Sequence, residues 1–232
     1  MIQTVPLSPP TIPPLENGDR LTRKEFERRY SAMPQLKKAE LIEGLVYMGS
    51  PLRITQHGEP HASIMVLLGL YRASTPGVQL GDNCTVRLDA ENEPQPDALL
   101  RIQWGGQSIV DEDGYVEGAP ELMVEIAASS VSIDLHKKRD VYQSNRVQEY
   151  IVWRVNDRAL EWFCLQDDRY VDLLPDPETG FLCSRVFPGL WLDRQALLRG
   201  DLVGAIATLQ QGLATAEHEA FVQQLATRNR LK

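Results

Sequence analysis

The chain has 232 residues, of which 43% are hydrophobic and 24% are charged. These proportions are typical of a globular protein with a core, and they exclude a wholly disordered or low-complexity chain. The formal net charge of −8 argues against a protein whose whole surface attracts nucleic acid.

The longest nearly unbroken apolar stretch, residues 64–71, is far shorter than the roughly 20 residues that a membrane-spanning helix needs. We therefore expect no membrane span, and the first residues lack the basic and apolar segments of a signal peptide. The three cysteines, Cys84, Cys164 and Cys183, are an odd number without the paired spacing of a zinc site. This pattern predicts reduced thiols in the cytoplasm.

The first 20 residues are expected to form an extended arm, because five prolines stand between Pro6 and Pro14. Thr22 then predicts the start of a short amphipathic helix that ends before Pro34. The apolar residues of 41–47 predict a pair of strands that turn near Gly44.

The middle of the chain alternates helical and strand patterns. Helical spacing predicts a helix over residues 61–73, before a Pro-Gly turn, and a second helix over residues 133–145. Short β-rich runs predict the central strands at residues 84–88, 97–102 and 122–126. Two more strands are expected at residues 150–155 and 160–165, and the last strands reach Trp191.

From residue 193 onward, leucine and alanine recur at helical spacing, which predicts two or three terminal helices. The whole pattern favours an α/β or α+β fold in which helices flank a mixed central sheet. We expect an arm at residues 1–20, one domain at residues 21–200 and a helical extension at residues 201–232.

Two acidic residues lie at the ends of predicted strands. Asp97 opens one strand and Glu125 ends another, within an acidic stretch, residues 81–125, that holds eleven acids and two arginines. Such a stretch is either a solvated surface or a cation site. Two carboxylates with water in the remaining positions are a typical protein contribution to a magnesium site. A loop aspartate and a solvated glutamate are the alternative.

The helix over residues 133–145 adds charged residues to its inner face. At about 100° per residue, its apolar residues cover half of the circumference, and Asp134 and Lys138 fall inside the same arc. A lysine held near the attacking water can position it and stabilise the charge that develops on a phosphate. A simple helix ion pair is the alternative. We favour Lys138 over Lys137 for the catalytic role.

These residues resemble a known family, the Uma-type putative restriction endonucleases of the PD-(D/E)XK nuclease superfamily. The resemblance runs from about residue 21 to residue 198. It rests on Glu40-Leu41-Ile42-Glu43-Gly44, Pro96-Asp97, Glu121-Leu122-Met123-Val124-Glu125-Ile126, Asp134 with Lys138 and Tyr142, and Glu149-Tyr150-Ile151-Val152.

The resemblance implies a restriction endonuclease-like fold and magnesium-dependent hydrolysis of phosphodiester bonds. It implies metal ligation by Asp97 and Glu125 and gives Lys138 the role of the catalytic lysine. The superfamily's lysine normally stands two residues after the second acid, where this chain has Ala127, so Lys138 would reach in from the helix.

Four further residues are candidates for the site. Glu40 matches a family glutamate that reaches the metal, and His61 matches a family histidine near the cleft, although structural roles remain open for both. Asp134 and Tyr142 belong to the same matched motif.

Two other patterns in the sequence favour structural roles. His57 and His61 have the spacing of helical zinc ligands, but Gly58 and Pro60 interrupt a regular helix between them. Trp153, Trp162, Phe163 and Trp191 are expected in the sheet core rather than as stacking partners for bases.

The leading hypothesis is a DNA endonuclease that depends on Mg²⁺, with Mn²⁺ as a substitute, and that acts as a cytoplasmic homodimer. The second is a catalytically inactive DNA-binding or regulatory module with a nuclease fold, which the alanine at position 127 and the acidic composition favour. The third is a scaffold that dimerises through the apolar faces of the terminal helices.

Overall fold

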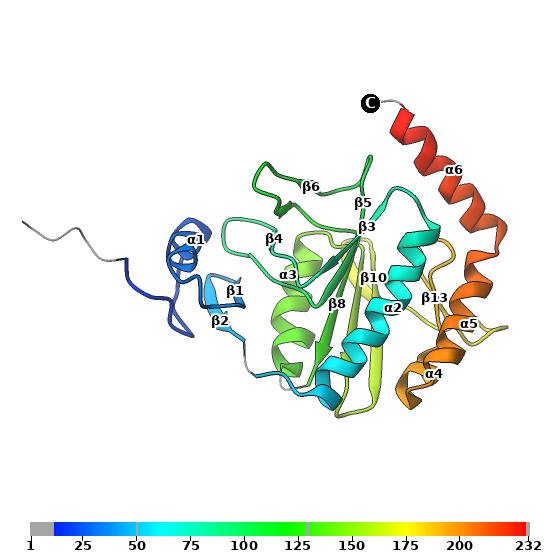
Figure 1. Cartoon of the computed structure of the whole chain (residues 1–232), viewed down its shortest axis with the longest axis horizontal. Helices are drawn as coiled ribbons and strands as arrows, with labels where there is room; N and C mark the ends of the chain where they lie inside the picture. Colours follow the sequence, from blue (N-terminus) through cyan, green and yellow to red (C-terminus); the bar gives the residue numbers. More distant parts are fainter. Residues whose placement is uncertain (1–11, 50, 129, 231–232) are drawn as a thin grey trace, which may run out of the picture.

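The computed structural model describes residues 12–49, 51–128 and 130–230. At its centre is a six-stranded sheet, made of β3 (Val78–Asp82), β5 (Ala98–Ile102), β8 (Leu122–Ala127), β9 (Glu149–Arg154), β10 (Ala159–Gln166) and β11 (Arg169–Asp172). The strand order is β11-β10-β9-β8-β5-β3 (Figure 1). Strands β8 and β9 run parallel and the other neighbours run antiparallel, which confirms the mixed central sheet.

Helices cover both faces of this sheet (Figure 1). One face carries α2 (Glu59–Ser74), which follows a π-helical turn, η1 (Ile54–Gly58), and the other carries a second π-helical turn, η2 (Ile133–Lys138), and α3 (Arg139–Ser144). Because side chains alternate along a strand, Leu122 and Val124 join the core beneath α2, whereas Met123 joins the core beneath α3. Both helices predicted in these regions are confirmed.

The N-terminal unit consists of α1 (Arg23–Ser31) and a hairpin of β1 (Ala39–Ile42) and β2 (Leu45–Met48). Thr22 caps α1 by accepting a hydrogen bond from the Glu25 amide at 3.4 Å, as the sequence predicts. Residues 1–11 of the expected arm lie outside the described residues. Leu15 is buried in the small core of this unit with Phe26, so the last part of the expected arm packs against the fold.

One expected central strand is wrong. Residues 84–88 contain β4 (Val86–Arg87), which belongs to a separate three-stranded sheet with β7 (Val116–Glu117) and β6 (Ile109–Val110). The amides of Val86 and Leu88 bond to the carbonyls of Pro94 and Asn92, so this run folds back on its own loop. The place in the central sheet is taken by β3, which the sequence analysis missed.

The C-terminal segment forms α4 (Arg194–Arg199), α5 (Leu202–Leu213) and α6 (Ala216–Arg230), after a small pair of strands, β12 (Leu182–Cys183) and β13 (Trp191–Leu192). Leu209 of α5 and Phe221 of α6 are buried in the same core as α2. The apolar faces that suggested dimerisation are therefore covered largely by the chain itself. Among the described residues, no helix is long and apolar enough to cross a membrane.

Candidate active site

The two acids from the strand ends lie opposite one another. Strands β5 and β8 are antiparallel with Ala98 opposite Val124, and the next step of this register places Asp97 opposite Glu125. The alternation of side chains turns both toward the α3 face of the sheet. The Ile126 amide donates a 2.7 Å hydrogen bond to Oδ2 of Asp97 and fixes that carboxylate.

Lys138 enters the same space from the end of η2. Its Nζ lies 2.8 Å from Oε1 of Glu40, 2.9 Å from Oε1 of Glu125 and 3.7 Å from Oδ1 of Asp134. Its side chain is only 4% exposed. Burial alone would lower the pKa of Lys138, but the carboxylates of Glu125, Glu40 and Asp134 hold it well above its usual value. The lysine is therefore a buried ammonium ion.

Each carboxylate around Lys138 has a second partner. Oε1 of Glu40 accepts a hydrogen bond from the Gln95 amide at 2.7 Å, and Tyr142 Oη donates to Oε1 of Glu125 at 2.8 Å. The side chain of Asp134 accepts a bond from Ser130 Oγ at 2.5 Å. The structure thus brings together six of the seven candidate residues: Glu40, Asp97, Glu125, Asp134, Lys138 and Tyr142.

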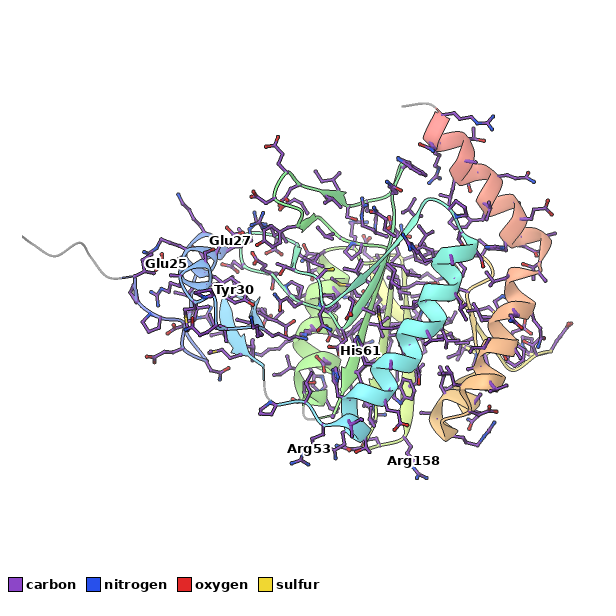
Figure 2. All side chains as sticks on the ribbon, in the orientation of Figure 1. Glu25, Glu27, Tyr30, Arg53, His61 and Arg158 are labelled. Atoms are coloured by element: carbon purple, nitrogen blue, oxygen red, sulfur yellow. The ribbon has the colours of Figure 1, made fainter. Side chains whose placement is uncertain are left out.

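The seventh candidate, His61, lies on α2 (Figure 2) and contacts the main chain of Asp97. Its Nε2 is 3.0 Å from the Asp97 carbonyl oxygen and 3.2 Å from Oδ1 of Asp82. His61 therefore lies at the edge of the site, on the backbone of Asp97 rather than on its carboxylate.

Sequence reasoning missed two residues that contact the Asp97 carboxylate. Lys38 Nζ and His57 Nε2 each lie 3.2 Å from Oδ1 of Asp97. The π-helical turn η1 carries His57 to this position. Lys38 stands two residues before Glu40, so strand alternation predicts that both turn to one side, a signal that was available in the sequence.

Negative charge exceeds positive charge in this cluster. Four carboxylates, from Glu40, Asp97, Glu125 and Asp134, face the ammonium groups of two lysines, Lys38 and Lys138.

Burial raises the pKa of Glu125, and the other carboxylates add to this effect against the opposing charge of Lys138, so that the pKa reaches about 8. Burial would also raise the pKa of Asp97, but the His57 hydrogen bond, the Lys38 charge and the Ile126 amide together lower it below its usual value. Glu125 is therefore the acid that takes up a proton more readily, whereas Asp97 stays ionised.

The donor atoms fit a hard divalent cation. Magnesium takes oxygen ligands and keeps several waters, so two carboxylates from Asp97 and Glu125 suffice. Among the described residues, Oε2 of Glu125 has no hydrogen-bond partner. No group of three or more His, Cys, Asp or Glu residues in this part of the chain is arranged as a metal site. Asp97 and Glu125 would hold the cation, with the rest of its ligands supplied by water.

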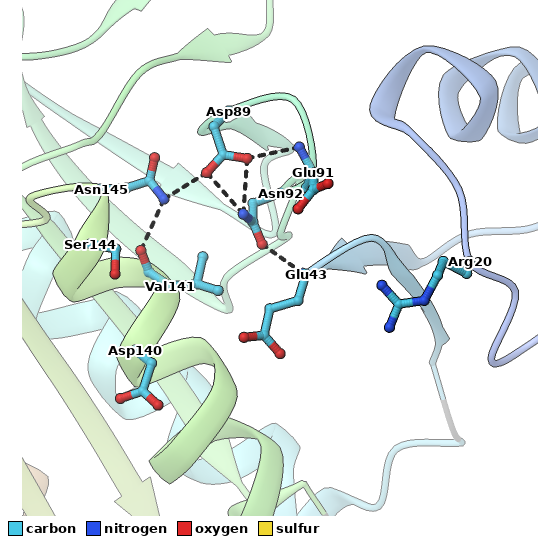
Figure 3. Close-up of a pocket in the computed structure, with 9 residues that line it drawn as sticks. All are labelled: Arg20, Glu43, Asp89, Glu91, Asn92, Asp140, Val141, Ser144 and Asn145. Atoms are coloured by element: carbon cyan, nitrogen blue, oxygen red, sulfur yellow. Dashed lines mark hydrogen bonds between the residues drawn. The ribbon is translucent and has the colours of Figure 1, made fainter.

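An acidic cavity lies elsewhere, beside the hairpin turn and the end of α3, with a volume of about 490 Å³ (Figure 3). Its polar groups already bind one another. Asp89 accepts hydrogen bonds from Asn92 and Asn145, and Oδ1 of Asn92 accepts one from the Glu43 amide at 2.7 Å. We interpret this network as a structural link between the N-terminal unit and α3.

The mixed six-stranded sheet with helices on both faces has a counterpart among solved structures. The structure is similar to the crystal structure of a putative nuclease from Anabaena variabilis that belongs to DUF820, with a TM-score of 0.54 and 14% sequence identity. The match covers 75% of this chain and 97% of that chain. A likeness at this identity shows the fold alone.

The sequence comparison assigns the family. Residues 23–195 match the model of the Uma2 family, described as putative restriction endonuclease. The chain therefore belongs to the Uma2 family, as its sequence motifs suggested. The comparison with curated proteins found no match.

Proposed function

We propose that this protein is a magnesium-dependent endodeoxyribonuclease, a hydrolase of phosphodiester bonds in DNA, and that Mn²⁺ can replace Mg²⁺. The observation that carries this proposal is the placement of Asp97 opposite Glu125 with Lys138 Nζ 2.9 Å from Glu125. The family and the nuclease fold support the reaction class.

A bound divalent cation would supply Lewis-acid chemistry, polarising the phosphate and lowering the pKa of water. The chain's own residues would do the rest. Asp97 and Glu125 would hold the cation, and Lys138 would orient the attacking water and stabilise the charge that develops on the phosphate. Tyr142 holds Glu125 in place through its 2.8 Å hydrogen bond.

Glu40 and Asp134 have a different role in this proposal. Their carboxylates keep Lys138 protonated, because each places a negative charge within 4 Å of its ammonium group. In the superfamily, the lysine stands on the strand two residues after the second acid. Here Lys138 reaches that acid, Glu125, from η2 instead. The alanine at position 127 therefore does not by itself exclude catalysis.

The DNA would approach an end of the sheet that carries exposed basic side chains. Arg53, just before η1, and Arg158, in the turn between β9 and β10, lie at the same end of the molecule in Figure 2. Gln56 of η1 donates a 3.4 Å hydrogen bond to Asn156, which ties these two segments together. Exposed arginines suit contacts to phosphate, which position DNA without reading its sequence.

The test is cleavage of supercoiled and linear DNA with Mg²⁺, Mn²⁺ or a chelator. Asp97→Asn and Lys138→Met should each reduce metal-dependent nicking by at least about 100-fold, because each removes a group that holds the cation or stabilises the transition state. Asp140→Asn, an exposed acid of α3, is the matched control. Cleavage by Asp97→Asn at the rate of the parent would contradict the site assignment.

An inactive DNA-binding or regulatory module is the second candidate. Two observations favour it: Lys38, His57 and Lys138 already partner the acidic side chains, and the chain has Ala127 where the superfamily has its lysine. Such a module should bind DNA equally well with and without Mg²⁺ in a calorimetric titration and never cut it. Turnover of DNA would exclude this reading.

The homodimer and the cytoplasmic location are further proposals. The apolar faces of the terminal helices no longer argue for a homodimer, because these helices pack against the chain's own core. Light scattering on the purified protein tests it, and a monomer mass at micromolar concentration would remove it.

A further inference from the structure

The two lysines of the site are held to different degrees. Lys138 is 4% exposed and is surrounded by three carboxylates. The side chain of Lys38 is 28% exposed, and its Nζ has two partners, Oδ1 of Asp97 at 3.2 Å and Oδ1 of Asn83 at 3.3 Å. Of the two lysines, Lys38 is therefore the one with access to solvent.

The backbone of Lys38 is fixed by the hairpin, and its side chain is partly exposed. The Gly49 amide donates a 3.2 Å hydrogen bond to the Lys38 carbonyl, and strand β1 begins at the next residue. Lysine has a flexible four-carbon stem and a compact charge, so its ammonium group can change partner without a change of backbone. The acids Glu40 and Asp97 outweigh burial and raise the pKa of Lys38, which keeps it charged.

Lys38 occupies the position that a cation on Asp97 requires. Oδ2 of Asp97 accepts a hydrogen bond from the backbone amide of Ile126, whereas the partners of Oδ1 are side chains, which a metal ion can replace without moving a strand. That oxygen already contacts Lys38 and His57 at 3.2 Å. A divalent cation on this oxygen would repel the ammonium group of Lys38 at this distance.

We propose that Lys38 is a displaceable counter-ion of the Asp97 carboxylate. It neutralises Asp97 in the metal-free chain, the incoming divalent cation displaces it, and the released ammonium group then contacts a phosphate of the DNA. This inference rests on the proposed function, since it takes Asp97 as a metal ligand.

The first test labels lysines of the wild-type protein with an amine-acylating reagent and measures the modified peptides by mass spectrometry, without DNA. Adding Mg²⁺ should raise the labelling rate of Lys38 several-fold, because its amine leaves the ion pair. Lys37, its exposed neighbour, is the internal control and should not change. A rate at Lys38 that is unchanged by Mg²⁺ would overturn the displacement.

The second test compares Lys38→Met with Lys37→Met. In an Mn²⁺ titration followed by electron paramagnetic resonance, Lys38→Met should bind the ion several-fold more tightly than wild type, because the competing charge is gone. In the presence of the ion, its DNA affinity should fall, and the salt slope of binding should decrease by about one, the loss of a single phosphate contact. Lys37→Met should match the wild type in both measurements.

The outcomes separate the two proposals. If the wild-type protein binds no Mn²⁺ and Asp97→Asn leaves DNA cleavage unchanged, the proposed function and this inference are both wrong. If wild type binds Mn²⁺ through Asp97 but Lys38→Met binds it equally or more weakly, Lys38 is a structural partner and only this inference is overturned.

Discussion

Replacing Lys138 by methionine tests the electrostatic balance of the site most directly. The change keeps an unbranched side chain of similar length and removes an ammonium ion that lies 2.8 Å from Glu40 and 2.9 Å from Glu125. Deleting one partner of a buried ion pair costs about 3–5 kcal/mol, because the remaining charge is left uncompensated. We expect a loss in this range, a large share of the roughly 5–15 kcal/mol that stabilises a typical domain.

Urea unfolding at pH 7 measures this loss, and its pH dependence identifies the cause. An acid whose pKa is raised in the folded state stabilises the fold below its ordinary pKa, and this stability is lost as the pH rises through the raised value. Burial and neighbouring acids already raise the pKa of Glu125 to about 8, and loss of Lys138 should raise it further. The deficit of the variant should therefore grow as the pH rises above about 8, where the folded parent ionises Glu125 and the folded variant does not.

Lys137→Met is the matched control. Lys137 is the preceding residue of η2 and donates a 2.9 Å hydrogen bond to Tyr47 Oη near the surface. Its replacement should cost no more than about 1 kcal/mol, the usual range for a surface contact. If Lys138→Met were as stable as Lys137→Met at pH 7, or if its deficit did not change with pH, Lys138 would not be the counter-charge of the cluster.

Three further predictions concern other buried groups. Burial and a neighbouring acid of α1 raise the pKa of Glu93 to about 8, so the stability of the fold should decrease as the pH rises from about 4.5 to 8. Glu93→Gln should remove up to about 5 kcal/mol of this pH dependence, measured by urea unfolding at pH 5 and 9. Tyr142→Phe removes a hydrogen bond to Glu125 and should cost about 1.5–3 kcal/mol by the same assay, while cleavage falls less than in Asp97→Asn. Gly189→Ala should lower the melting temperature more than Gly180→Ala, because both have positive φ but only at Gly189 would the new Cβ lie 2.8 Å from a side-chain carbon of α6.

Each of these has an outcome that would contradict it. An unchanged pH dependence in Glu93→Gln would show that this carboxyl is ionised in the fold at neutral pH. A fully stable Tyr142→Phe would mean that water replaces the phenol. Equal melting temperatures for the two glycine variants would mean that α6 moves aside without cost.

The core of the site was predictable because the positions of its residues follow from helical spacing and from apolar strand runs. Helical spacing places Lys138 on the inner face of its helix, and clear apolar runs mark the buried strand that follows Asp97 and the one that contains Glu125. The structure brings these three residues together, and their catalytic roles remain predictions.

The missing parts depend on contacts between distant segments. Strand β3 contains Gln79 and Gly81, which weaken its strand signal, but a Cβ at Gly81 would lie 2.9 Å from Leu99, so the close packing of β3 on β5 favours glycine there. His57 was set aside because Gly58 and Pro60 interrupt an α-helix, yet a π-helical turn accommodates them. Neither pairing could be derived from local sequence alone.

The two π-helical turns have a consequence for how the site is encoded. A π-helical turn contains an extra residue relative to an α-helical turn, so each residue advances by less than about 100° around the helix axis. Lys138 is the last residue of η2, so the direction from which it meets the carboxylates depends on this wider winding. The winding of this turn, and not its side chains alone, therefore sets how Lys138 meets the carboxylates.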